Sequence, residues 1–217
     1  TETASFLPNV SFGFIPSDIF NVAEIPQQYE IVPEPANFLT YSFLHVDFWH
    51  LAGNMLFLWV FGDNVEDAMG HLRFLVFYFL CAAAGAMAHG LMDMTSQVPL
   101  IGASGAVAGV IAAYLMLHPK VRVWVLVLMR IPLPLPASIV LGLWIGMQVY
   151  MFFVDPDNAV SWGAHLGGIL AGLMLVVVFK RRSVPLFDQQ VELPDAVIVE
   201  PDPAPKPVKQ ERNWGRD

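Results

Sequence analysis

Hydrophobic residues run in long blocks through the middle of this chain, whereas prolines and polar residues gather at its two ends. The apolar blocks are about 17–23 residues long and are separated by charges or turn residues, which is typical of membrane-spanning helices. We predict five such helices, over residues 39–61, 74–92, 101–117, 137–154 and 161–179. The expected fold class is therefore an all-α polytopic membrane protein.

The flanks and one internal stretch do not fit this pattern. Residues 1–38 contain five prolines, a spacing that forbids a spanning helix and indicates a structured loop or an interfacial segment. Residues 183–217 contain six prolines and predict a solvated, disordered tail. The apolar stretch 121–131 includes Arg122 and Arg130, so we expect it to be interfacial. The predicted organisation is thus a loop (1–38), a membrane core (39–182) and a tail (183–217).

Composition narrows the class of protein further. Of the 217 residues, 56% are hydrophobic and 14% are charged, and the mean hydropathy is +0.56. Soluble domains carry about 25% charged residues, so neither a soluble domain nor a disordered regulator fits. A single Cys excludes a disulfide-stapled fold, and a net charge of −8 argues against a nucleic-acid partner. The partner that remains is the lipid bilayer.

The basic residues are distributed unevenly along the chain. All 11 Lys and Arg residues lie at or after Arg73, in the loops after the first, third and fifth predicted helices and in the tail. The alternate loops carry Asp93, Asp155 and Asp157 and no basic residue. By the positive-inside rule, the first predicted helix starts outside a cell membrane and the tail is cytosolic. Because residues 1–38 would then lie outside, we expect another spanning helix ahead of Thr1.

Polar side chains inside the apolar blocks are costly and indicate functional sites. Ser104 lies about three residues into its block and His165 about four, which is roughly 5–6 Å deep at about 1.5 Å per residue. These two helices enter from the same side, so Ser104 and His165 can meet. His50 and Asn54 are four residues apart and share one face of their helix. The full set is His45, Asp47, His50, Asn54, His89, Ser104 and His165.

The residues around Ser104 and His165 suit a catalytic pair. Small-xxx-small glycine pairs let helix backbones approach closely. At such a distance His165 could take the proton that makes the Ser104 hydroxyl a nucleophile. Asn54, His50 and the backbone N–H groups near Ser104 could stabilise an oxyanion. The glycine pairs are Gly105/Gly109, Gly163/Gly167 and Gly168/Gly172.

Three motifs in order resemble the rhomboid intramembrane serine proteases of the bacterial type. They are His50-Leu51-Ala52-Gly53-Asn54 (with His45 ahead of it), Gly102-Ala103-Ser104-Gly105, and Ala164-His165-Leu166-Gly167-Gly168. The stretches 61–67 and 70–74 also resemble the family's cytosolic turn, so the likeness covers residues 39–180. In two respects the chain departs from some members. Residues 1–38 hold no Trp-Arg pair, and Ala108 stands where an aromatic residue often packs on the base.

The resemblance implies a six-helix core whose second to sixth helices are the five predicted here. It implies that Ser104 is the nucleophile, that His165 is the general base, and that Asn54 and His50 stabilise the oxyanion. The expected activity is cleavage of transmembrane substrate helices near the outer face. Neither a cofactor nor a metal is expected, and the sequence does not indicate an oligomeric state.

Other functions account for fewer of these residues. A rhomboid-like pseudoprotease that binds transmembrane clients without cutting them is the main alternative, although such relatives usually lose the Ser or the His. A transporter or proton relay through His50, His89 and His165 would need polar residues across the whole bilayer. A bis-His haem protein would leave the serine motif unexplained. Taken alone, Ser104 is typical of a small residue at a helix interface, and the pair His50 and Asn54 is typical of a structural hydrogen bond. It is the depth of His165, equal to that of Ser104, that favours catalysis.

Overall fold

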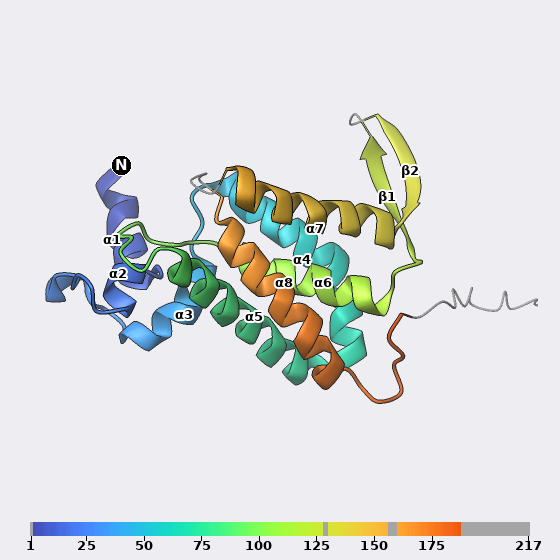
Figure 1. Cartoon of the computed structure of the whole chain (residues 1–217), viewed down its shortest axis with the longest axis horizontal. Coiled ribbons are helices and arrows are strands. Elements are labelled where there is room, and N and C mark those ends of the chain that lie inside the picture. Colours follow the sequence, from blue (N-terminus) through green and yellow to red (C-terminus); the bar gives the residue numbers. More distant parts are fainter. Residues whose placement is uncertain (1, 128–129, 156–159, 188–217) are drawn as a thin grey trace, which may run out of the picture.

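The structure is a bundle of five long helices with a short-helix segment at one end and a β-hairpin at the other (Figure 1). It is a computed structural model, and it describes residues 2–127, 130–155 and 160–187. The long helices are α4 (Phe48–Met69), α5 (His71–Met92), α6 (Ser104–Leu117), α7 (Ala137–Val154) and α8 (Trp162–Phe179). The predicted all-α polytopic fold is confirmed. The predicted tail lies almost entirely outside the described residues.

Helix α4 differs most from its prediction, since it spans Phe48–Met69 rather than 39–61. Asp47 sets its start, because this side chain accepts a hydrogen bond from the backbone N–H of His50 at 2.8 Å. Gly70, at φ 90°, ends α4 and separates it from α5. The residues before Asp47 instead form the short helices α3 (Asn37–Thr40) and η3 (Tyr41–Phe43). His50 therefore lies in the first turn of its helix.

Helix α6 is the centre of the bundle, with 11 of its 14 residues buried. It packs against α4, α5, α7 and α8. The predicted glycine pairs make these contacts close. A Cβ atom at Gly168 would overlap the carbonyl oxygen of Gly105, and one at Gly172 would overlap that of Gly109. Gly163 and Gly167 lie instead against α5. Helix α8 thus uses one glycine pair for α6 and the other for α5.

The stretch 121–131, predicted to be interfacial, contains β1 (Arg122–Val127), which forms an antiparallel β-hairpin with β2 (Ile131–Pro136). Prolines alternate along β2, where Pro132, Pro134 and Pro136 pair with Leu126, Trp124 and Arg122. Proline lacks an N–H, so it is tolerated only where the strand edge is free. The hairpin leads directly into α7.

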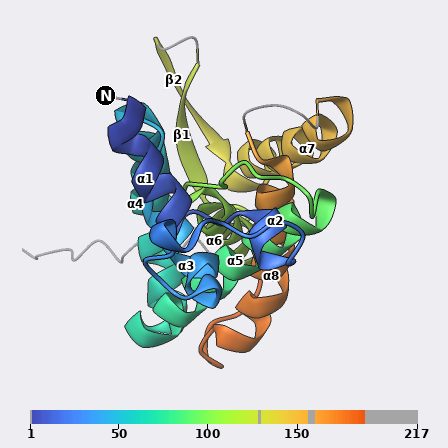
Figure 2. The ribbon, with the colours of Figure 1, turned by 90° about the vertical axis from the view of Figure 1, so that its left-hand side faces the viewer.

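The N-terminal segment covers one end of the bundle, as Figure 2 shows for α1 (Glu2–Phe12), α2 (Pro16–Ile19) and α3. Two further short turns, η1 (Gln27–Tyr29) and η2 (Glu34–Ala36), lie between α2 and α3. Phe14, fully buried, forms an isolated β-bridge with Leu100. The Tyr41 hydroxyl donates to the carbonyl of Ala82 in α5 at 2.8 Å. The segment is therefore a packed loop built from short helices, some of which include a proline.

The surface of the bundle is that of a membrane protein. Large apolar side chains point outward, among them Trp59 (77% exposed) and Val178 (75%). Helices α5, α7 and α8 are long and apolar enough to cross a membrane. Helix α6 has 14 residues, about 21 Å, and is shorter than the bilayer's hydrocarbon core of about 30 Å. That α4 and α6 also cross remains a prediction.

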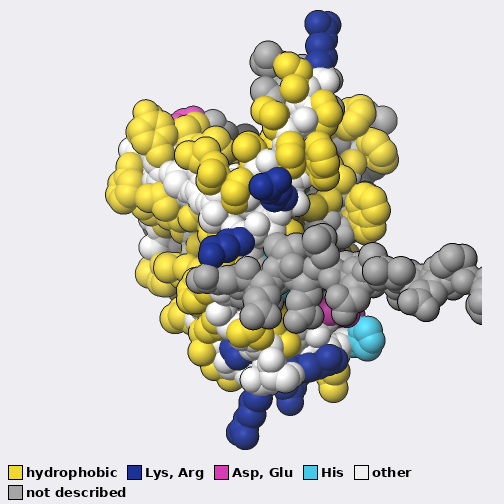
Figure 3. All heavy atoms as spheres, turned by 90° about the vertical axis from the view of Figure 1, so that its right-hand side faces the viewer, with side chains coloured by type: hydrophobic (Ala, Val, Ile, Leu, Met, Phe, Trp, Pro, Cys, Tyr) yellow, Lys and Arg dark blue, Asp and Glu magenta, His cyan; other side chains and the backbone are white. Residues whose placement is uncertain are grey.

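The described basic side chains gather at one end of the bundle. They lie at the start of α5, around the hairpin and after α8, at Arg73, Lys120, Arg122, Arg130, Lys180, Arg181 and Arg182. Figure 3 shows that end of the molecule, with dark-blue side chains spread among yellow hydrophobic ones. Helices α4, α6 and α8 all begin at the opposite end (Figure 1).

Candidate active site

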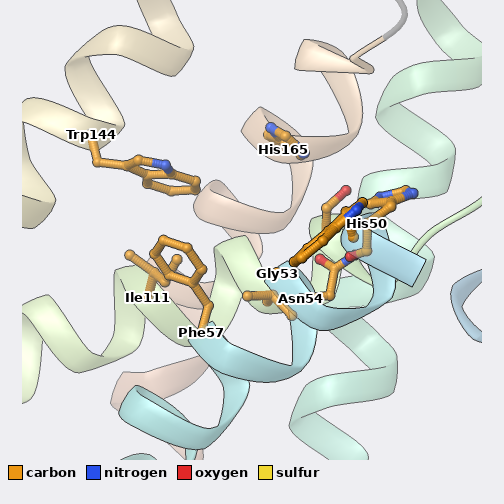
Figure 4. A pocket seen from close by; sticks show the side chains of 10 residues that line it. His50, Gly53, Asn54, Phe57, Ile111, Trp144 and His165 are labelled. Carbon is orange, nitrogen blue, oxygen red and sulfur yellow. The ribbon is translucent and has the colours of Figure 1, made fainter. Parts of the chain in front are cut away.

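A cavity of about 290 Å³ opens where α4, α6, α7 and α8 converge. All four residues predicted from the sequence line it: His50 and Asn54 from α4, Ser104 from α6 and His165 from α8. In Figure 4, His165 faces the turn of α4 that carries His50 and Asn54, and Trp144 and Phe57 lie toward the other end of the cavity. The complete lining is Trp49, His50, Gly53, Asn54, Phe57, Ser104, Val107, Ile111, Trp144 and His165.

Ser104 is the first residue of α6. The first N–H groups of a helix have no acceptor within it, so those at Ser104 and Gly105 are available to a ligand. Gly102, at φ 120°, turns the chain immediately before this helix. A Cβ atom on Gly102 would lie 2.7 Å from Cε1 of His50. The absent side chain therefore lets the His50 ring pack directly on the loop that presents Ser104.

His165 is 9% exposed and lies in the first turn of α8. Its Nδ1 is 2.7 Å from Oε1 of Gln148 in α7. Two aromatic rings lie beside the imidazole, Trp144 with centroids 6.3 Å apart and Trp162 at 6.0 Å. Within the described residues, no hydrogen bond joins Ser104 to His165, although both line the cavity. Catalytic hydrogen bonds often tighten only when substrate is bound.

Asn54 is 7% exposed, and its Nδ2 donates to the backbone carbonyl of His50 at 3.0 Å. An amide nitrogen carries two hydrogens, so one of them is left for a ligand in the cavity. His45 lies just before α4, with its ring 5.1 Å from that of His50. Partial burial, together with the neighbouring His50, lowers the pKa of His45 below its ordinary value. His45 is not part of the cavity lining.

His89 does not join the cavity either. The hydroxyl of Ser161 accepts from the backbone N–H of Ala164 at 3.2 Å and lies 2.7 Å from Nδ1 of His89. A hydroxyl that already accepts can still donate, so the geometry suits donation from Ser161 to an unprotonated Nδ1. His89 thereby ties the C-terminal part of α5 to the cap of α8. This arrangement gives His89 a structural role at the end of the bundle where the cavity lies.

Two residues beside His165 were not predicted from the sequence as part of the site. Gln148 is the only amide in α7 and is 2% exposed in a helix that otherwise turns most of its surface outward. An isolated amide in an apolar block is itself a signal. Trp144 packs against the cluster of buried Ala108, Ala112 and Ile169 as well as lying beside His165.

Comparison with known proteins identifies the family. The Rhomboid domain family matches residues 33–182. The chain belongs to the rhomboid family. Its matched region contains α4 to α8, the hairpin and every residue of the cavity.

Rhomboid relatives come from several kinds of organism. The chain is 30% identical to Rhomboid protein 1, mitochondrial, from Saccharomyces cerevisiae, over 68% of this chain and 42% of that protein. It is 30% identical to the human Rhomboid-related protein 3, over 71% and 39% respectively. It is 33% identical to the Rhomboid protease GluP of Bacillus subtilis, over 62% and 24%. The chain therefore spans less than half the length of these relatives.

Proposed function

We propose that this rhomboid is an intramembrane serine endopeptidase that cleaves transmembrane segments of other membrane proteins. The observation that carries the proposal is the shared cavity of Ser104, His165, His50 and Asn54, drawn from three helices that begin at one end of the bundle. Support also comes from the similarity to a relative whose name is Rhomboid protease. An apolar bundle surface suits a substrate that arrives through the lipid.

The proposed chemistry follows from the roles of these side chains. His165 takes the proton of the Ser104 hydroxyl as its oxygen attacks the scissile carbonyl carbon. The carbonyl electron pair moves onto oxygen, where the Asn54 amide, His50 and the N–H groups at the start of α6 stabilise it. Collapse of this intermediate breaks the peptide C–N bond, and His165 returns the proton to the leaving amine. Water then hydrolyses the acyl-enzyme by the same route.

The location of the chemistry follows from the charges. The described Lys and Arg residues lie at the hairpin end, opposite the helix starts that form the cavity. With the basic end cytosolic, the cavity opens on the extracytoplasmic side of a cell membrane. Substrates would then be cut near the outer face. Two relatives carry the word mitochondrial in their names. In an organelle membrane, the same distribution of charges would place the basic end of the bundle on the matrix side.

A fluorophosphonate probe tests the nucleophile. The detergent-solubilised protein is expected to be labelled, and Ser104→Ala is expected to lose all labelling and all cleavage of a model transmembrane substrate. Ser138→Ala is a matched control, because Ser138 lies in the first turn of α7, outside the cavity. Labelling that survives Ser104→Ala would contradict the proposal. Substrate capture without labelling or cleavage would instead identify a pseudoprotease.

A further inference from the structure

The side chain of Gln148 fixes the orientation of its own amide. Its nitrogen Nε2 donates to the backbone carbonyl of Trp144, one helical turn earlier, at 3.3 Å. A carbonyl oxygen cannot donate, so the nitrogen must point to Trp144 and the oxygen to His165. The opposite orientation would bring two acceptors together. Gln148 therefore presents Oε1, an acceptor, to the imidazole.

This orientation determines the protonation of His165. Because Oε1 only accepts, the Nδ1 atom 2.7 Å away must carry a hydrogen. A neutral imidazole has one hydrogen, so Nε2 is left with a free lone pair. Gln148 is 2% exposed and His165 9%, so water does not compete for this contact. Trp144 and Trp162 hold the ring at its other surfaces.

We propose that Gln148 is a positioning residue for His165: it holds the imidazole in the Nδ1–H tautomer with Nε2 as the base. This inference rests on the proposed protease function. It also gives α7 a part in the reaction, although that helix supplies neither the nucleophile nor the base. A carboxylate would hold the same tautomer, but a buried charge within the membrane is costly. A neutral amide avoids that cost.

The test compares two substitutions at Gln148 with one elsewhere in α7. Gln148→Met keeps the length of the side chain and removes the acceptor, and Gln148→Glu keeps an acceptor. Gln148→Met is expected to lower kcat by about 10–100-fold, the loss typical when the hydrogen-bond partner that orients a metal-binding imidazole is removed, with KM changed less than about twofold. Gln148→Glu is expected to retain more of kcat than Gln148→Met. Leu141→Ala, at another buried position of α7, is expected to lower thermal stability and leave kcat of the folded protein nearly unchanged.

A second readout does not depend on activity. Nitrogen-15 NMR of labelled histidines, with His165→Ala to assign the resonance, distinguishes the two neutral tautomers. The Nδ1–H form is expected in the unsubstituted protein and in a Ser104→Ala background, and a mixture is expected with Gln148→Met. An unchanged tautomer, or an unchanged kcat in a protein that cleaves, would overturn the role of Gln148. If fluorophosphonate labelled neither the unsubstituted protein nor any variant, the protease function would be overturned. The tautomer that Gln148 imposes on His165 would still be decided by the NMR measurement.

Discussion

The His165 imidazole shows how much of a side chain's environment comes from distant parts of the chain. Gln148 and Trp144 reach it from α7, and Trp162 reaches it from its own helix. Only Trp162 is close to His165 in sequence. The contacts with this imidazole are thus made mostly by tertiary packing, and local motifs do not reveal them.

Gly102 allows a test of how closely the His50 ring and the Ser104 loop are coupled. Gly102→Ala places a Cβ at φ 120°, where side chains are strained, and 2.7 Å from His50. Since a shift of about 1 Å in an active site can cost about 10²-fold, fluorophosphonate labelling is expected to slow at least about 10-fold. The measurement is the labelling rate at fixed probe concentration.

The control for this substitution is Gly142→Ala. A Cβ at Gly142 meets nothing within 4 Å, so labelling should proceed at the original rate. If Gly102→Ala also labelled at that rate, the packing of His50 on this loop would have no bearing on reactivity.

The candidate residues themselves could be predicted from the sequence because their spacing and depth are local properties. Ser104 and His165 were recognisable as polar groups near one end of an apolar block, and His50 and Asn54 as two polar groups four residues apart in another block. Gln148 was overlooked although it is an amide in an apolar helix. The importance of Gln148 depends on which neighbouring helix its side of α7 packs against. Hydrophobicity alone cannot identify that neighbour in a chain whose helices are apolar on every side.

At the scale of elements, helix ends were harder to predict than helix existence. Residues 39–61 were predicted as one helix, yet the helix begins at Phe48 because Asp47 caps it. The hairpin of β1 and β2 was missed for a related reason. Its alternating prolines exclude a helix, but only the pairing with residues 122–127 makes the segment a strand.

The glycine contacts between α6 and α8 give the sharpest prediction at this scale. Gly168→Ala would force a Cβ into the carbonyl oxygen of Gly105, so the helices must separate. Overpacking of this kind costs about 1–3 kcal/mol, and we expect a lower midpoint of thermal unfolding in detergent. Gly146→Ala is the matched control, because nothing lies within 4 Å of a Cβ there and alanine favours a helix by about 1 kcal/mol. Equal midpoints for the two variants would show that the α6–α8 contact is looser than the structure has it.

At the scale of the whole molecule, the described basic side chains and the cavity lie at opposite ends of the bundle. The cavity is formed where α4, α6 and α8 begin, and the described basic residues lie where α6 and α8 end. The sequence indicated this arrangement because charges in loops report orientation without any knowledge of packing. It could not indicate the cavity, whose walls come from four helices.

Cysteine accessibility tests which end faces the cytosol. The chain's single cysteine, Cys81, is fully buried, so the unsubstituted protein should not react with a membrane-impermeant maleimide. Gln97→Cys places a thiol in the exposed loop before α6, and Ser183→Cys places one in the exposed turn after α8. In intact cells Gln97→Cys is expected to react, and Ser183→Cys only after the membrane is permeabilised. The reverse pattern would put the cavity on the cytosolic side, and equal reactivity of both thiols in intact cells would contradict a bundle that spans the membrane.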